Sequence, residues 1–247
     1  MNEIIESLIS RKSVRSFTNQ EISKDDKKLI IRCALEAPTG GNQMPYSILD
    51  ITDPKVLQAL SESCDHQPFI ATAKMCLIFC VDLTKWDGAL KSIGLNPKKP
   101  GPGSLLLSSS DAFIAAQNTV VAAWSLGIGS CYIGDILEQY EFHKELLGLP
   151  ATVVPVAMLV FGYPTPQQKD RKKPARFAPE YVVFENKYKS LNQDELKAMF
   201  TQRGEKDNLD YNYQDWLTAF FKRKYDVDFA REMQRSVKKY FEEFDGD

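Results

Sequence analysis

One long stretch without charge limits the folds that are open to this chain. No Asp, Glu, Lys or Arg occurs over residues 112–134, and a stretch of that length raises the question of a membrane span. Its middle carries Gln117, Asn118 and Thr119, which favour a different placement. We therefore predict a helix over about 105–126 that is buried inside the protein or at a subunit interface.

The overall composition is that of a globular protein with almost balanced charge. The chain has 247 residues, with 31 Lys and Arg against 33 Asp and Glu and a formal net charge of -2. Its length allows one large domain or two small ones. The near-neutral balance gives no electrostatic reason to bind nucleic acid or a membrane surface. No basic and then apolar segment of a secretory signal is visible at the start, so we expect a cytoplasmic protein.

Cysteine and histidine are too scattered for a metal centre. The five cysteines have irregular spacings and indicate reduced thiols that mostly fill the core. The two histidines have no partner at a metal-binding spacing, so we expect no metal site. These residues are Cys33, Cys64, Cys76, Cys80, Cys131, His66 and His143.

Periodicity and end signals predict the other elements. Ser23 and Asp26 form a helix-capping pattern, and Pro38 ends the helix that follows. The runs 75–81 and 153–161 are continuously apolar and predict buried strands. We also expect a short first helix that ends near residue 10 and helices over 54–63, 68–74 and 139–147. Two further strands are expected, over 46–51 and 181–184.

The end of the chain differs in composition from the rest. From residue 193 it becomes polar and helical, with an apolar stripe along 229–244 that must pack on something. We therefore divide the chain into a core, 1–190, and a helical C-terminal extension, 191–247, that packs on the core or on a partner subunit. Within the core, residues 91–104 are rich in Gly and Pro and predict a mobile loop that could serve as a lid.

Residues 11–17, with the sequence Arg-Lys-Ser-Val-Arg-Ser-Phe, form the first candidate binding segment. Three cations and two hydroxyls suit a phosphate, because Arg offers a planar fork and Lys a point charge. Val14 and Phe17 can fix the segment against the core. An ordinary basic surface is the alternative, and the segment alone does not exclude it.

Glycine marks two further segments. Residues 38–45 expose backbone N–H groups, and glycine there lets a flat ligand approach the main chain, although a plain turn is equally compatible. The glycines at 127, 129 and 134 follow a helix and lack the spacing of a dinucleotide-binding fingerprint. We therefore exclude a Rossmann site.

Four motifs, taken in order, resemble one known family. They are RKSVRSF at 11–17, APTGGNQMP at 37–45, SLGIGSCYIG at 125–134, and FGYP at 161–164 followed by KKPARF at 172–177. Each is weak alone. The ordered set resembles the FMN-dependent nitroreductase family, and within it the oxygen-insensitive, NADPH-dependent nitroreductases and flavin reductases.

The resemblance implies an α+β fold, with a mixed sheet surrounded by helices, and an intertwined homodimer whose FMN sites lie at the subunit interface. The uncharged helix fits such an interface. The residues that would surround the FMN phosphate are Arg11, Lys12, Ser13 and Arg15. Those that would line the flavin ring and ribityl chain are Thr39, Gln67, Tyr132, Ile133, Gly134 and Asp135. A later basic pair would be Lys173 and Arg176, with one residue inserted before Arg176, and Arg203 would bind the coenzyme phosphate.

The implied activity is that of an NAD(P)H oxidoreductase with FMN as cofactor. By this resemblance, a ping-pong scheme moves hydride through flavin N5 to a small-molecule electron acceptor, which is a nitroaromatic, a quinone or a flavin. The cofactor carries the chemistry, so we assign no catalytic side chain.

The sequence leaves the coenzyme and the reaction open. Residues 205–209 are partly acidic and have only Lys206 as a cation, so NADH use is a hypothesis beside NADPH. The alternatives to the main interpretation are a flavin-dependent dehydrogenase of the same fold, with substrate contacts from the loop 91–104, and a non-catalytic dimeric binding protein.

Overall fold

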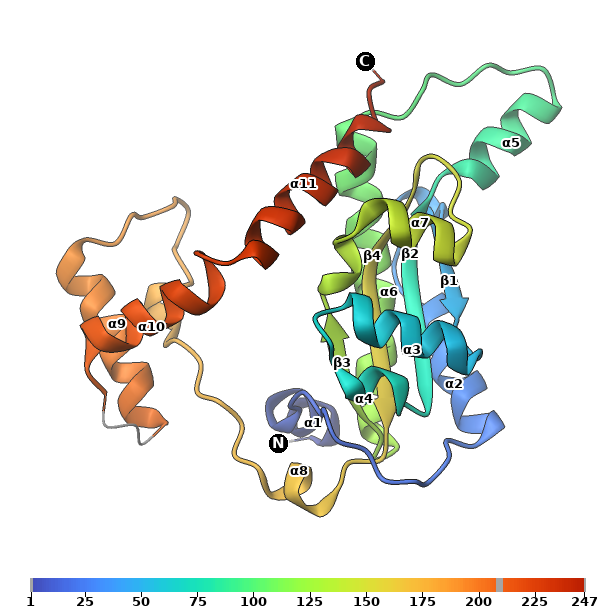
Figure 1. Ribbon diagram of the computed structural model, residues 1–247. Helices are drawn as coiled ribbons and strands as arrows, with labels where there is room; N and C mark the ends of the chain where they lie inside the picture. The colour runs from blue at the N-terminus through green and yellow to red at the C-terminus, as the bar shows by residue number, and fades with distance from the viewer. Residues whose placement is uncertain (1, 208–210, 247) are drawn as a thin grey trace. The chain divides into compact units, whose positions relative to one another are not determined.

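A computed structural model describes residues 2–207 and 211–246 (Figure 1). The strands are β1 (Tyr46–Asp50), β2 (Met75–Asp82), β3 (Gly129–Ile133) and β4 (Val153–Gly162). The α-helices are α1 (Glu3–Ser10), α2 (Lys24–Leu35), α3 (Pro54–Ser63), α4 (Pro68–Ala71), α5 (Thr84–Ser92), α6 (Pro102–Ser125), α7 (Tyr140–Leu147), α8 (Pro166–Asp170), α9 (Gln193–Lys206), α10 (Tyr213–Lys224) and α11 (Asp228–Glu242). The short 3-10 helices are η1 (Gly40–Asn42), η2 (Asp135–Leu137) and η3 (Pro179–Tyr181).

The four strands form one antiparallel sheet in the order β1-β2-β4-β3. Every pair of adjacent strands in this sheet runs in opposite directions. The α+β class is confirmed. The expectation of a mixed sheet is not met by the four strands, and the described residues hold one isolated parallel bridge, between Ser13 and Ser130 of β3.

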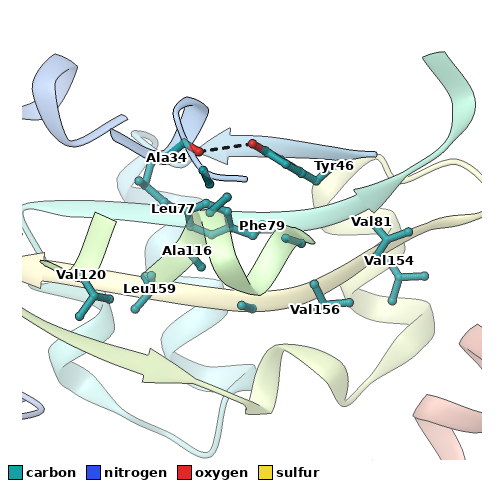
Figure 2. Close-up of a cluster of buried hydrophobic side chains, with 14 of the residues drawn as sticks. Ala34, Tyr46, Leu77, Phe79, Val81, Ala116, Val120, Val154, Val156 and Leu159 are labelled. Carbon is teal, nitrogen blue, oxygen red and sulfur yellow. Dashed lines mark hydrogen bonds between the residues drawn. The ribbon is translucent and has the colours of Figure 1, made fainter. Parts of the chain in front are cut away.

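Alternating side chains of the two central strands build a core on each face of the sheet. Leu77, Phe79 and Val81 point to one face, towards α2 and α6, and pack with Leu159 of β4 (Figure 2). The residues between them point to the other face, towards α3 and α4. Every residue of β2 and β4 is buried, as expected for strands covered on both faces.

Helix α6 is the helix predicted over about 105–126, and it carries no charge after Asp111. It runs along one face of the sheet (Figure 1), and its small residues allow a close approach. The fully buried positions are Ala112, Ala115, Ala116, Thr119, Val120 and Ala123. No helix in the described ranges has the length and apolar character that crossing a bilayer requires.

The contacts divide the chain into two compact units, and their boundary differs from the one predicted at residue 190. Unit 1 comprises Met1–Arg171 with Glu232–Asp247, and unit 2 comprises Lys172–Arg231. The end of the chain returns to the core because the side chains of Tyr240 and Phe244 are buried there. Glu243 holds this contact, since it accepts hydrogen bonds from the Tyr140 hydroxyl at 2.5 Å and from the Thr152 N–H at 2.9 Å.

Three local expectations need correction. Residues 181–184 do not form a strand: Tyr181 ends η3, and Val182 and Val183 are exposed and pair with no strand among the described residues. The loop expected over 91–104 is shorter, because its first residues belong to α5 and its last residues belong to α6. It is also held by the end of the chain, where the Gly246 N–H donates to the Pro100 carbonyl and Lys99 pairs with Asp245.

His143, on α7, is fully buried. Its Nδ1 lies 3.1 Å from the Ile136 carbonyl oxygen and its Nε2 lies 2.8 Å from Ser63 Oγ. A carbonyl can only accept, so Nδ1 carries the proton and Nε2 accepts from the Ser63 hydroxyl. Burial lowers the pKa of His143 below its ordinary value, against the opposing effect of hydrogen bonds to the backbone of Glu138 and Ile136.

This burial predicts how stability depends on pH. The folded protein binds fewer protons at His143 than the unfolded chain, so the free energy of unfolding is full above about pH 6.5 and falls as the pH drops below it. Urea unfolding followed from about pH 5 to about pH 8 measures this slope. His143→Gln should flatten it, whereas His66→Asn, at the exposed second histidine, should leave it intact. Equal slopes in all three proteins would contradict this origin.

Candidate functional site

The N-terminal binding segment lies along β3, an edge strand of the sheet. The Val14 N–H donates to the Ser130 carbonyl at 2.9 Å, and Ser13 forms a bridge with the same residue. Val14 is fully buried and lies directly over Gly129. A Cβ added at Gly129 would come within 2.5 Å of the Val14 side chain, so only glycine allows this approach.

Phe17 repeats this arrangement three residues later. A Cβ at Gly162 would lie 2.6 Å from the Phe17 ring, and Gly162 is the partner of Gly129 across β3 and β4. The Thr18 N–H donates to the Tyr163 carbonyl at 2.8 Å. The prediction that Val14 and Phe17 fix this segment against the core is confirmed, and their contacts set where the neighbouring cations lie.

The two arginines of the segment lie close to β3. The Cys131 thiol of β3 donates to the Tyr132 carbonyl at 3.4 Å. Burial raises the pKa of that thiol, and the charges of Arg15 and Arg11 act in the opposite direction. Burial also raises the pKa of Tyr132 to about 12, again opposed by Arg11. The charges of the two arginines therefore act on neighbouring residues of β3, Cys131 and Tyr132.

Lys12 has a different role from its neighbours. Its ammonium group donates to the carbonyl of Lys169 at 2.6 Å and to the carbonyl of Arg171. In return, Arg171 Nη2 donates to the Ser13 carbonyl at 2.6 Å. The Gln168 side chain accepts from the Arg15 N–H at 3.4 Å. Residues 11–15 and 168–171 thus form a reciprocal clasp, which we call the 12/171 clasp.

The end of β3 carries the second group of predicted residues. Gln67 Nε2 donates to Asp135 Oδ2 at 3.0 Å and to the Cys64 carbonyl at 2.8 Å. This contact joins two predicted site residues that lie far apart in the sequence. Between them, Gly134 precedes η2. The Ile133 side chain is buried in the core at 2% exposure, so only its main chain is left to face a ligand.

Thr39 lies apart from these residues. Its hydroxyl donates to Asp111 Oδ2 of α6 at 2.6 Å and accepts from the Met44 N–H at 2.9 Å. The loop leads into β1, the edge strand opposite β3. Two strands separate these edges, which corresponds to roughly 14 Å. The structure therefore groups the predicted residues of 11–15, 67 and 132–135 around β3 and leaves Thr39 at the other side.

The last three predicted residues belong to unit 2. The Arg203 guanidinium lies against three aromatic rings, 4.3 Å from the centroid of Phe177 and 4.9 Å from that of Trp216. Arg176 and Arg203 line one cavity of about 250 Å³. The aromatic contacts favour a fixed orientation for Arg203. Lys173 lies in the same unit, and its assignment to the site stays a prediction.

Sequence reasoning missed Asp111 and Arg171. Asp111 is the last charged residue before the uncharged stretch, and its position beside Thr39 depends on tertiary packing that no local pattern shows. Arg171 lies in the basic run 169–176, from which only Lys173 and Arg176 were singled out. The described residues hold no group of three or more His, Cys, Asp or Glu side chains arranged for a metal ion.

Comparisons with known proteins agree on one family. Residues 8–163 match the family described as the Nitroreductase family. The chain is 30% identical to the FMN reductase [NAD(P)H] of Bacillus subtilis (strain 168) over 244 residues, which cover 98% of this chain and 92% of that protein. It is 32% identical to the oxygen-insensitive NADPH nitroreductase of Salmonella typhimurium over 205 residues, covering 83% and 82%.

The solved structures give the same result. The structure of B. megaterium NfrA2 has a TM-score of 0.82 and 28% identity and covers 100% of both chains. That of NfrA1 nitroreductase from B. subtilis has a TM-score of 0.81 and 27% identity, and covers 97% of this chain and 98% of that one.

The contact between Thr39 and Asp111 predicts a measurable loss of stability. Asp111→Ala leaves the Thr39 hydroxyl and the Gly40 N–H, which donates to the same oxygen at 3.1 Å, without their acceptor. Hydrogen bonds to a charged group contribute about 1.5–3 kcal/mol, so the free energy of unfolding should fall by that amount in urea titrations. Asp111→Asn keeps an acceptor oxygen and should lose less. An equal loss in both variants would mean that the charge, not the hydrogen bonds, stabilises the loop.

Proposed function

The chain belongs to the nitroreductase family, and from this premise we propose that it is an FMN-dependent NAD(P)H oxidoreductase. The observation that carries the proposal is that residues 13 and 14 pair with Ser130 of β3, which places the charge of Arg11 near Tyr132 and that of Arg15 near Cys131. These residues offer charge at one end and an aromatic side chain next to it. A flavin mononucleotide has the matching parts, a phosphate and a flat ring system.

The residues present fit the cofactor. The family implies FMN, and the proposed phosphate contacts are Arg11, Ser13 and Arg15, since guanidinium groups bind phosphate oxygens in a planar fork. The proposed contacts of the ring and ribityl chain are Gln67, Tyr132, Gly134 and Asp135, of which Gln67 and Asp135 are joined by a hydrogen bond. When bound, FMN supplies the hydride chemistry. The protein supplies binding and orientation.

The substrates follow from the names of the relatives. Curated relatives include an FMN reductase and an oxygen-insensitive NADPH nitroreductase, so the proposed acceptors are nitroaromatics, quinones or free flavin. The proposed kinetic order is ping-pong, in which the oxidised coenzyme leaves before the acceptor binds. The protein is proposed to act in the cytoplasm.

The choice of coenzyme rests on unit 2. Arg203 is the predicted contact for the 2′-phosphate of NADPH, but its guanidinium lies against aromatic rings. Of the partly acidic segment after it, Asn208 and Leu209 lie outside the described residues. The aromatic contacts of Arg203 support the proposal that the enzyme accepts NADH as well as NADPH.

A homodimer accounts for two features of unit 1. The first is the position of Thr39 away from β3, because in a dimer with two-fold symmetry the partner's copy of that loop can meet the β3 edge. The second is a set of large apolar side chains exposed on three neighbouring helices. On α6, Leu107 is 75% exposed and Leu106 is 62% exposed. The others are Ile4, Ile5, Leu8, Ile9, Leu29, Leu35, Phe113 and Ile114.

Absorption spectra test the activity directly. The purified protein should show the bands of oxidised flavin, and these should bleach when one equivalent of NADH or of NADPH is added without oxygen. The relative rates with the two nucleotides report the coenzyme preference. Bands that neither nucleotide bleaches would support a flavin-dependent dehydrogenase instead. A colourless protein that FMN cannot reconstitute would leave only a non-catalytic binding protein and refute the proposal.

The assembly is tested by changing one exposed side chain. Leu107→Lys places a charge in the proposed interface, so sedimentation velocity should show a shift from dimer to monomer at a given concentration. Ile93→Lys is a matched control, because Ile93 is 73% exposed and lies outside the three helices. A wild-type protein that sediments as a monomer would refute the dimer.

A further inference from the structure

A cavity of about 520 Å³ lies beside α5 and the loop that joins α5 to α6. Its volume is in the range of about 300–1,000 Å³ that small-molecule sites occupy. An indole, an aliphatic side chain, a cation and two hydroxyls are among the groups around it. They belong to Trp86, Leu90, Lys98, Ser104 and Thr152. This mixture suits an organic molecule with an apolar body and a polar group.

The cavity is separate from the proposed phosphate contacts of the flavin. None of the residues assigned to FMN or to the coenzyme is among those that line it. Thr152 directly precedes β4, whereas Phe17 of the segment 11–17 contacts the other end of that strand, at Gly162. The ten residues of β4 correspond to roughly 30 Å. A molecule in the cavity therefore occupies a different site.

Contacts from the end of the chain fix one wall of the cavity. Gly101 and Gly246 pack so closely that a Cβ on either would meet the main chain of the opposite segment. The Gly246 N–H donates to the Pro100 carbonyl at 3.3 Å, and Lys99 pairs with Asp245. The protein itself thus holds this Gly- and Pro-rich loop in place, as in binding sites that are largely formed in advance.

A second wall contains a strained residue. Thr152 has a φ of 61°, in the left-handed region that β-branched residues rarely adopt. Its N–H donates to Glu243 Oε2 at 2.9 Å, and Glu243 is held in turn by Tyr140 and Lys144. Such strain persists where surrounding contacts enforce it, and it collects at ligand sites. The Thr152 hydroxyl has no hydrogen-bond partner among the described residues, so it is free for a ligand.

The charges around the cavity leave one cation without a partner. Lys91 pairs with Asp87 at 2.7 Å, and Lys99 pairs with Asp245. Lys98 forms no ion pair or hydrogen bond within the ranges that the structure describes. The first turn of α6 forms a neighbouring wall, and the N-terminal end of a helix favours negative charge. The cavity therefore suits an anion better than a neutral or cationic molecule.

Trp86 supplies a flat apolar surface in a fixed orientation. Its side chain is 43% exposed, and its indole N–H donates to the Gln43 carbonyl at 2.7 Å. Aromatic pairs gain free energy beyond the area that they bury, so a fixed indole favours an aromatic ligand over an aliphatic one. Leu90 extends the apolar wall beside it.

We propose that this cavity is a second ligand site, which binds a small aromatic carboxylate. Its rings lie against Trp86 and Leu90, and its carboxylate accepts hydrogen bonds from Lys98 and from the hydroxyls of Ser104 and Thr152. The proposal does not depend on the flavin chemistry, because it uses none of the residues assigned to the cofactor.

Calorimetric titration of the full chain with 2-naphthoate tests this assignment. The wild-type protein should bind one molecule per chain at this site. The uncharged analogue 2-naphthylmethanol has the same rings but no carboxylate, and it should bind about tenfold more weakly or worse, because it lacks the charge-assisted contact. In Lys98→Gln the affinity for 2-naphthoate should fall by a similar factor, whereas that for 2-naphthylmethanol should stay unchanged.

Two further variants locate the site. Ser104→Leu places a larger side chain in the cavity and should weaken the binding of both compounds. Lys55→Gln is a matched control for charge, since Lys55 is an exposed lysine of α3 that does not line the cavity. This variant should keep the affinity of the wild-type protein for 2-naphthoate.

Four outcomes would overturn the proposal. The first is a wild-type protein that does not bind 2-naphthoate at millimolar concentration, and the second is equal affinity for the two compounds. The third is a loss in Lys55→Gln as large as that in Lys98→Gln, which would indicate a general charge effect. The fourth is binding that neither Lys98→Gln nor Ser104→Leu weakens, which would place the ligand elsewhere. In all four cases the proposed flavin enzyme would stand, because the absorption spectra test it separately.

Discussion

The pairing of two glycines across β3 and β4 is the constraint on which the candidate site depends. Gly129 and Gly162 face each other in the sheet, and the missing side chains leave room for Val14 and Phe17. Because these two residues lie three apart, the segment between them has little freedom. The cations on either side of Val14 are therefore presented to β3 by apolar packing rather than by their own charge, which would by itself repel them from one another.

Much of the fold could be predicted because its signals are local. The cap of α2 at Ser23, which accepts from the Asp26 N–H, is readable from four residues. The apolar runs of β2 and β4 reflect burial on both faces. In contrast, β3 is only five residues long, and Gly127 and Gly129 lie at its start. It forms a strand because it pairs with β4. Residues 181–184 show the converse, since Val182 and Val183 have strand propensity but stay exposed and pair with no strand in the described ranges.

The candidate site was predictable to the extent that its residues are neighbours in the chain. Arg11, Ser13 and Arg15 came from one motif, and their position beside β3 agrees with a binding segment. The roles of Lys12 and Arg171 could not be predicted, because they follow from hydrogen bonds across more than 150 residues. The same holds for Asp111, which contacts Thr39 across 72 positions. Sequence shows which side chains are available, and long-range packing decides which of them stay free for a ligand.

Helix α6 connects the parts of the site that the sheet keeps apart. Asp111 holds Thr39, and Gln117 lies 3.4 Å from the Tyr132 hydroxyl that donates to it. Asp111 and Gln117 are about 9 Å apart along the axis of α6. The same helix exposes Leu106, Leu107 and Phe113. A partner subunit that covers this face would therefore press on the element that positions both Thr39 and Tyr132. In the proposed dimer, assembly and ligand binding are linked through one rigid helix, and the lack of charge after Asp111 serves the core and the interface together.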